Sequence, residues 1–374
     1  MTKTFLHAAA LALALAGCAS APPPLAYPAT PTVAQTDSYF GTTVADPYRW
    51  LEDDNAAQTK AWVAAQNRVT DGVLDAIAFR PALRERLRAL ANYARYSAPF
   101  QKNGWLFFYK NDGLQNQSVL YVQRGAAGAP EVLLDPNTFS ADGTVRLASF
   151  RLSRDGRYAV YAKTAIPGSD WQDLYVLDMT TRRTLPEVLH WVKFSGTAWR
   201  GDGFYYSRYA APSPGSELTT RAENQKVYFH RVGTEQDSDT LVYEDPAHPT
   251  RLVGVDTTED ERFAVLQSFQ FGRRGNDLFV RDERAGERSF RPIVAEIGDA
   301  RFDVIDSVGN ELLVATTLGA PNRRVVRVDP ARPAPSDWAT VLPERPEVLQ
   351  HVTSAGGRLF ANYLKDVRSQ IQVF

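Results

Sequence analysis

Through most of the chain, short segments of alternating apolar and polar residues are separated by turn residues. The clearest example is the segment 150–178. Its turn at 154–157 contains Gly156, which can adopt the positive φ angle that a tight turn requires. Residues 158–162 then alternate aromatic and aliphatic side chains, and 174–177 form the next apolar run. This segment is predicted to form three antiparallel strands.

The same pattern recurs in units spaced about 45 to 50 residues apart, which is the length of a four-stranded propeller blade. A β-sandwich would not need so many similar units. We therefore predict a mainly β fold, an incomplete β-propeller, in residues 93–374. The apolar runs of the six units are 104–109 and 118–122; 150–178; 192–195, 203–207 and 226–230; 262–266 and 277–280; 311–316 and 324–328; and 358–363.

Two helices are predicted before the strands, in residues 37–92. Asn55, with Gln58 three residues later, has the spacing of a capping box at the start of the first helix. Pro81 can begin the second helix. Each predicted helix has an apolar stripe that needs a packing partner. The stripe of the first helix contains Trp62, Val69 and Val73, and that of the second contains Leu83, Leu87 and Leu90.

Composition narrows the possible functions. The 374 residues include 42 basic and 43 acidic side chains, which are interleaved, so no basic face for nucleic acid is expected. The 16 Tyr, 19 Phe and 7 Trp favour a β-rich body. Because Cys18 is the single cysteine, an intrachain disulfide and a cysteine-based metal site are excluded.

The N-terminal segment has the pattern of a secretory signal. Lys3 precedes a short apolar run, 5–16, which is shorter than the roughly 20 residues of a membrane span. Small residues directly before Cys18 resemble a bacterial lipobox, which implies acylation of Cys18 after cleavage. An ordinary cleaved signal with a nearby cysteine is the alternative. We expect a lipoprotein signal peptide at 1–18, a proline-rich tether at 19–36, and a periplasmic, membrane-anchored protein.

Six motifs, in order along the chain, closely resemble the N-terminal half of prolyl oligopeptidases. The resemblance covers about residues 39–374, which is nearly the whole mature chain. The motifs are Asp46 to Glu52 with Lys60 to Val63 and Gln66-Asn67; Gly168 to Trp171; Val192 to Ser195; Gln225 to Tyr228; Leu318 to Asn322; and Tyr363 to Asp366.

This resemblance implies a serine peptidase that cleaves short peptides after proline. In the family, a seven-bladed propeller caps the active site, and the N-terminal helices pack on a C-terminal α/β-hydrolase domain that carries the Ser-His-Asp triad. The chain would then hold those helices and about five and a half blades, without the catalytic domain. Its partners would be short peptides, that hydrolase domain and, through Cys18, a membrane.

The residues themselves give no sign of catalytic machinery. No Gly-x-Ser-x-Gly pentapeptide is present, and this motif forms the strained turn of a hydrolase nucleophile. The four histidines after the signal segment, His190, His230, His248 and His351, have no paired spacing. We predict no catalytic residue in this chain, no metal site and no cofactor.

Two side chains are candidate site residues because of the resemblance. Phe194, in the Val-Lys-Phe-Ser motif, matches a family phenylalanine that contacts substrate; the alternative is an aromatic of a blade core. Asp170 matches a residue that contacts the hydrolase domain; the alternative is a loop aspartate that caps a turn.

Two other functions remain open at this point. The first is an oligopeptidase of the same superfamily that cleaves after basic residues. The second is a non-catalytic, lipid-anchored propeller that acts as a binding module.

Overall fold

The computed structural model describes residues 25–374, so the predicted signal peptide and the predicted acylation site Cys18 lie outside the described residues. The chain divides into two compact units at Ala91 and Asn92. The boundary predicted from the sequence lies one residue later. Each unit is described by itself below.

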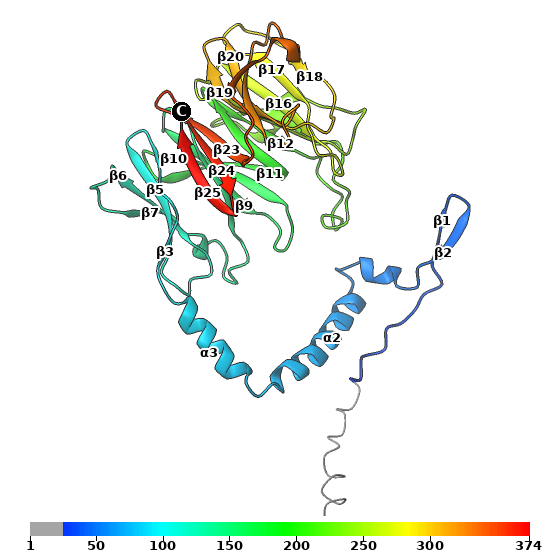
Figure 1. The fold of residues 1–374 in the computed structure, drawn as a ribbon. Helices are drawn as coiled ribbons and strands as arrows, with labels where there is room; N and C mark the ends of the chain where they lie inside the picture. Colours follow the sequence, from blue (N-terminus) through cyan, green and yellow to red (C-terminus); the bar gives the residue numbers. More distant parts are fainter. Residues whose placement is uncertain (1–24) are drawn as a thin grey trace, which may run out of the picture. The chain divides into compact units, whose positions relative to one another are not determined.

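The N-terminal unit contains a β-hairpin and helices. The hairpin pairs β1 (Thr36–Tyr39) with β2 (Thr42–Ala45), and a 3₁₀ turn, η1 (Arg49–Glu52), follows. The two predicted helices are present as α2 (Ala57–Asp75) and α3 (Arg80–Ala91) (Figure 1). Within the described chain, no helix has the length and apolar character needed to cross a membrane.

The predicted cap of the first helix is wrong. Helix α2 begins at Ala57, and Asn55 makes no capping hydrogen bond; the N-cap residue is Ala56. Instead, the Asp53 carboxylate accepts from the backbone N–H groups of Asn55 and Ala56, both at 3.0 Å. An aspartate can close such a turn from two residues upstream, which leaves the asparagine outside it.

Part of the predicted tether, residues 19–36, is bound to the rest of this unit. The Trp50 indole donates to the Pro31 carbonyl at 2.8 Å, and the Trp62 indole donates to the Thr30 hydroxyl at 3.0 Å. The two indole rings meet edge to face, with centroids 6.4 Å apart. The described end of this segment is therefore held by two tryptophans.

The second unit is built of antiparallel sheets, which we call blades 1 to 6. Blade 1 contains β3 (Arg95–Tyr96), β4 (Phe100–Lys102), β5 (Trp105–Asn111), β6 (Val119–Arg124) and β7 (Glu131–Leu134). Blade 2 contains β8 (Leu147–Leu152), β9 (Tyr158–Thr164), β10 (Gln172–Asp178) and the first part of β11 (Arg183–Arg200). Blade 3 contains the last part of β11, with β12 (Gly203–Arg208), β13 (Lys226–Arg231) and β14 (Thr240–Tyr243).

The remaining blades follow in chain order. Blade 4 contains β15 (Leu252–Thr257), β16 (Phe263–Phe269), β17 (Leu278–Asp282) and β18 (Arg291–Val294). Blade 5 contains β19 (Phe302–Val308), β20 (Glu311–Thr316), β21 (Arg324–Val328) and β22 (Ala339–Leu342). Blade 6 has three strands, β23 (Val348–Ala355), β24 (Arg358–Lys365) and β25 (Arg368–Val373).

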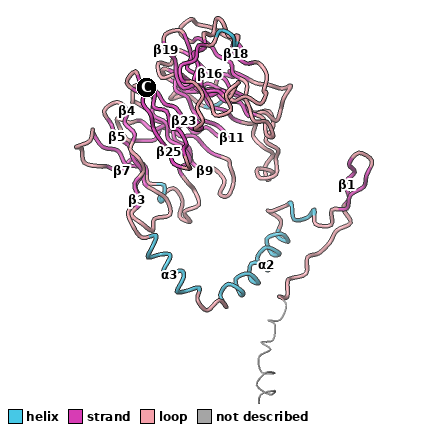
Figure 2. The backbone as a smooth tube through the Cα atoms, viewed as in Figure 1, coloured by secondary structure: helices cyan, strands magenta, loops and turns pink. Residues whose placement is uncertain are grey.

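These sheets confirm the predicted mainly β architecture of about five and a half blades. Figure 2 shows that helical segments in this unit are only short turns between strands, namely η2 (Pro136–Thr138), η3 (Gln236–Ser238) and η4 (Pro335–Asp337). The predicted turn between β8 and β9 is also present. Gly156 there has a φ of 73°, and a Cβ at this position would lie 2.6 Å from the Asn103 amide nitrogen.

Strand β11 connects blade 2 to blade 3 without a break. Val192 pairs with Gln172 of β10 and with Arg208 of β12, so it marks the crossing point. The register against β12 then shifts and resumes at Thr197. The two blades therefore form one seven-stranded sheet, with an irregular segment at the crossing.

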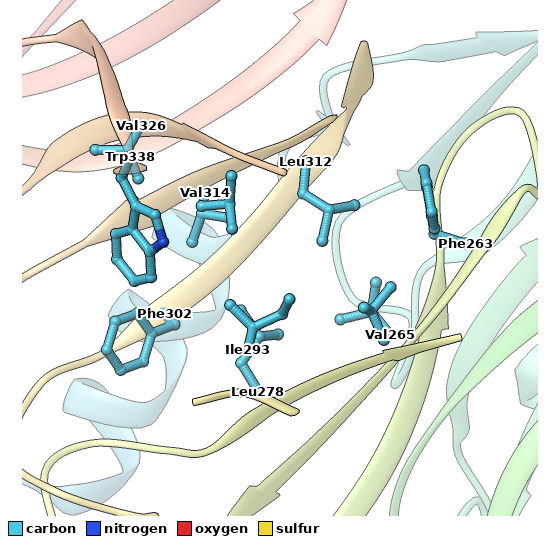
Figure 3. Packing of buried hydrophobic residues seen from close by; sticks show 11 residues of the cluster. Phe263, Val265, Leu278, Ile293, Phe302, Leu312, Val314, Val326 and Trp338 are labelled. Atoms are coloured by element: carbon cyan, nitrogen blue, oxygen red, sulfur yellow. The ribbon is translucent and has the colours of Figure 1, made fainter. Parts of the chain in front are cut away.

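Apolar side chains between neighbouring blades form the core of this unit. Between blades 4 and 5, side chains from β16, β17 and β18 face those of β19, β20 and β21 (Figure 3). Phe302 and Trp338 meet edge to face at 6.0 Å, and Leu278, Leu312 and Val314 are fully buried. Each blade thus covers the face of the next, as the recurring apolar runs require.

Candidate functional site

A central channel is lined by strands of five blades. Its volume is about 1240 Å³. Side chains of β4, β8, β15, β19 and β23 line it, which shows that these strands converge on one axis. The lining is rich in charged groups, including Lys102, Arg151, Asp256, Asp303 and Arg323.

One end of the channel is crossed by hydrogen bonds between the turns of different blades. The Lys102 ammonium of blade 1 lies 3.4 Å from Glu259 Oε1 of blade 4. The Arg154 guanidinium of blade 2 donates to the Glu259 carbonyl, and the Asn103 amide of blade 1 donates to the Arg154 carbonyl at 2.7 Å.

Blades 5 and 6 join the same set of contacts through Asp306. One of its oxygens accepts from the Glu259 N–H at 3.0 Å, and the other accepts from the Ser354 hydroxyl at 2.8 Å. We call this group of residues the polar belt. Its members are Lys102, Asn103, Arg154, Glu259, Asp306 and Ser354.

The candidate residue Phe194 lies at the other end of an inner strand. The part of β11 that belongs to blade 3 ends at Arg200, and the next turn lies on the belt side, because Gly201 N–H donates to Glu261 at 2.8 Å. Phe194 precedes this part of the strand. It is therefore placed away from the polar belt, where the chain crosses between blades 2 and 3.

The backbone around Phe194 is strained and firmly held. Trp191 and Phe194 have φ angles of 61° and 53°, a region that bulky residues rarely adopt. The buried Gln225 holds the segment, because its amide donates to the Lys193 carbonyl at 2.7 Å and its oxygen accepts from the Val253 N–H at 2.8 Å. Strain of this kind costs about 1–3 kcal/mol per residue and is characteristic of functional sites.

Aromatic side chains surround this crossing. Trp171 is buried, and its ring meets Trp191 and Tyr209 edge to face at 5.7 and 5.9 Å. Burial raises the pKa of Tyr209 to about 12. Phe194 lies outside this buried group and meets Phe271 edge to face at 6.4 Å.

The structure distinguishes the two interpretations of Phe194 and Asp170 only in part. Phe194 is 43% exposed, so it is not an aromatic of a blade core. Asp170 is exposed in the loop between β9 and β10, and the turn there is held by Ser169, whose hydroxyl donates to the Ile166 carbonyl at 2.8 Å. A substrate contact for Phe194 and a domain contact for Asp170 stay predictions.

One histidine belongs to a buried network. His230 Nδ1 lies 2.7 Å from Asp239 Oδ1, and the other Asp239 oxygen accepts from the Tyr206 hydroxyl at 2.6 Å. Burial, followed by the neighbouring Asp239, raises the pKa of Tyr206. His230 and the Asp239 side chain have no solvent exposure, so this network fixes the loop after β13 rather than reaching a ligand.

The other histidines do not form a catalytic arrangement. His190 pairs with Asp173 at 2.8 Å and His248 pairs with Asp245 at 2.9 Å, while His351 lines the channel. Across residues 25–374, no serine hydroxyl is hydrogen-bonded to a histidine ring, and no group of three metal-ligating side chains was found. That the triad lies elsewhere stays a prediction.

Comparison with known proteins identifies the fold. The family model of the prolyl oligopeptidase N-terminal β-propeller domain matches residues 28–374. This chain belongs to the prolyl oligopeptidase family. The resemblance found in the six sequence motifs is thereby confirmed at the level of the family.

Relatives of this family match along most of the chain. It is 42% identical over 351 residues to a prolyl endopeptidase of Elizabethkingia meningoseptica, an alignment that covers 94% of this chain and 49% of that protein. It is 31% identical to the dual function macrocyclase-peptidase POPB of Galerina marginata, covering 93% of this chain and 52% of that protein. The chain therefore spans about half the length of the curated relatives it matches.

Solved structures agree. A prolyl endopeptidase structure matches with a TM-score of 0.83 and 33% identity, covering 93% of this chain and 51% of that one. Prolyl oligopeptidase B of Galerina marginata, solved with a 35mer substrate, matches with a TM-score of 0.82 and 30% identity, covering 95% of this chain and 53% of that one.

Sequence reasoning missed the residues that hold the site. Gln225 appeared only as part of a motif, and Tyr209 was not singled out. No sequence signal marks Gln225, because its hydrogen bonds go to backbone groups of Lys193 and Val253 that the fold brings near it. The polar belt had no signal either, since its residues lie in turns and strands far apart in the sequence.

Proposed function

We propose that this chain is the substrate-gating half of a prolyl endopeptidase-like serine peptidase that acts on short proline-containing peptides. In this proposal, the propeller admits peptides and excludes folded proteins by size. Its surface around Phe194 contacts the peptide while a hydrolase domain cleaves it. The cleavage would proceed by acyl transfer through a serine activated by a histidine.

The proposal is supported by the match of residues 28–374 to the N-terminal β-propeller model of this family. It is also supported by an exposed aromatic side chain, Phe194, in the Val192 to Ser195 motif. Phe194 is exposed, strained and braced by Gln225. A side chain held in this way loses little freedom on binding, which favours a contact role.

An enzymatic chimera tests the proposal. Residues 25–374 are joined to the C-terminal half of the Elizabethkingia meningoseptica prolyl endopeptidase, which is the half that this chain does not match. We expect hydrolysis of a Gly-Pro reporter peptide and no cleavage of a folded protein. Phe194→Ala should raise KM with little change in kcat, whereas the matched exposed-aromatic variant Phe360→Ala should not.

The rival functions appear as distinct outcomes of this test. Cleavage only after lysine or arginine would point to the basic-specific oligopeptidases. A chimera that is folded yet inactive toward every peptide, with a propeller that still binds peptides, would point to a binding module.

We also propose that Cys18 carries a lipid anchor and that the protein is periplasmic. The support is sequence alone, namely the small residues directly before the single cysteine. Cys18→Ser should move the protein from the membrane fraction to the soluble fraction, or leave it unprocessed. Mass spectrometry that finds cleavage at another bond and a free Cys18 thiol would contradict this.

A further inference from the structure

The ammonium of Lys193 lies beside Phe194 without a carboxylate partner. It is 5.1 Å from the centre of the Trp171 ring and 5.3 Å from that of Phe194. No carboxylate in the described part of the chain lies within ion-pair distance of it. Four other lysines do have such partners, at the pairs Lys102–Glu259, Lys110–Asp112, Lys226–Glu244 and Lys365–Glu347.

An exposed apolar platform adjoins this charge. Phe194 and Phe271 are 43% and 75% exposed, and their rings meet edge to face. The Trp171 ring beneath Lys193 is buried, and its indole donates to the Glu217 carbonyl at 2.6 Å. Stacking on these rings holds the ammonium next to the platform.

The position of Lys193 is fixed by its backbone. Its carbonyl accepts from the buried Gln225, and it lies between the two residues with positive φ, Trp191 and Phe194. Lys193 and Phe194 are therefore presented together on a held segment, and Phe271 adjoins them from the turn after β16.

We propose that Lys193 selects peptides carrying an acidic side chain two residues from the apolar residue that stacks on Phe194 and Phe271. This inference rests on the proposed function. In an extended peptide, side chains two residues apart lie on the same face and roughly 7 Å apart, so a carboxylate at that spacing can reach an ammonium 5.3 Å from the Phe194 ring. An endopeptidase holds internal segments of its substrate, which favours a side-chain carboxylate over the peptide's C-terminus.

Three peptides test the inference on the whole chain by titration calorimetry. The first is acetylated and amidated and contains Phe-Ala-Glu before Gly-Pro. The second replaces Glu by Gln, and the third is the Gln peptide with a free C-terminal carboxylate. We expect the Glu peptide to bind about three- to five-fold more tightly than the Gln peptide, as suits a partly exposed charge pair. The difference should shrink between about 20 and 300 mM salt.

Substitutions of single lysines test whether Lys193 causes the preference for the Glu peptide. Lys193→Met should abolish the preference for the Glu peptide and leave binding of the Gln peptide unchanged, whereas Lys193→Arg should keep the preference. Lys365→Met, at a lysine that already has a carboxylate partner, is the matched control and should change nothing. The thermal unfolding midpoint of each variant verifies that it is folded.

The outcomes separate this inference from the proposed function. If no peptide binds, the peptide-contacting surface itself is wrong. If the Glu and Gln peptides bind equally, or Lys193→Met keeps the preference, the inference about Lys193 is overturned and the proposed function stands. If only the free C-terminal carboxylate improves binding, the assignment to a side chain is overturned.

Discussion

The helical unit and the propeller use their apolar residues in opposite ways. In the propeller, large side chains such as Phe204, Leu266 and Leu278 are fully buried between blades. Within the described part of the helical unit, Thr59 is the only buried residue. The apolar stripe of α3 is open, with Leu83, Leu87 and Leu90 49–56% exposed. Both patterns look equally apolar in the sequence.

The difference in burial reflects where the packing partner of each apolar pattern lies in the chain. A blade packs against the blade that follows it in the chain, so recurring strand units supply both faces of each contact. An apolar stripe on a helix predicts only that some other surface packs on it, and it does not indicate which one. Burial stabilises by roughly 25 cal/mol per Å² of apolar surface, so the open stripe of α3 contributes little to the free energy of unfolding.

The largest loss of stability should come from truncating a buried side chain of the propeller. Phe204→Ala removes a ring that touches Trp199 and Tyr206 in the core between blades 2 and 3. It should lower the free energy of unfolding by about 3–5 kcal/mol. Leu87→Ala on the exposed face of α3 should change it by less than about 1 kcal/mol. Urea unfolding followed by circular dichroism measures both, and equal losses would remove the contrast between the units.

A smaller loss is expected from the buried polar network. Asp239→Ala removes the acceptor of the Tyr206 hydroxyl and the carboxylate beside the His230 ring, both inside the protein, which should cost about 2–4 kcal/mol. The matched variant is Asp173→Ala, which removes the partner of the half-exposed His190. It should cost less than about 1 kcal/mol because water can replace the lost contact. Comparable costs would show that the network is not what fixes this loop.

The pH dependence of stability should separate two propeller aspartates. Burial alone would raise the pKa of Asp282, but hydrogen bonds from Arg262 and the N–H of Ala285 outweigh it and lower the pKa. An aspartate whose pKa is lowered in the folded protein stabilises the fold at pH values above its unfolded-state pKa, near 4. This stabilisation is lost as the pH falls through the folded-state pKa. For Asp277, burial dominates and raises the pKa, which gives the opposite sign.

Thermal unfolding between pH 3 and 7 tests this pair. Asp282→Asn should lower the unfolding temperature at pH 7 and have less effect near pH 3. Asp277→Asn can still accept the hydrogen bond that the Ser268 N–H donates, and it should not lower the unfolding temperature at pH 7. If Asp277→Asn lowered the unfolding temperature, and did so more strongly toward neutral pH, burial would not raise the pKa of Asp277 as assigned.

The sequence predicted the elements of this molecule better than the details that make a site. Alternation of apolar residues predicted the strands around Gly156, because each strand has one buried face. The strain at Trp191 and Phe194 had no signal, since no glycine marks those two positive φ angles. The hydrogen bonds of Gln225 and Asn55 could not be predicted from the sequence either. Hydrogen bonds of single polar residues depend on which backbone group lies nearby, and only the fold decides that.

The smallest expected effect concerns the polar belt, the contact set that joins blades far apart in the sequence. Glu259→Gln removes the ion pair with Lys102 while keeping the shape of the side chain. Because the Glu259 side chain is 69% exposed, the free energy of unfolding should change by less than about 1 kcal/mol. The pair nevertheless links blade 1 to blade 4, so amide hydrogen exchange should accelerate in the turn after Lys102. Glu311→Gln, whose pair with Arg327 lies within blade 5, is the control and should leave that turn unchanged. Unchanged exchange in Glu259→Gln would mean that the backbone contacts of Arg154 and Asp306 hold the belt by themselves.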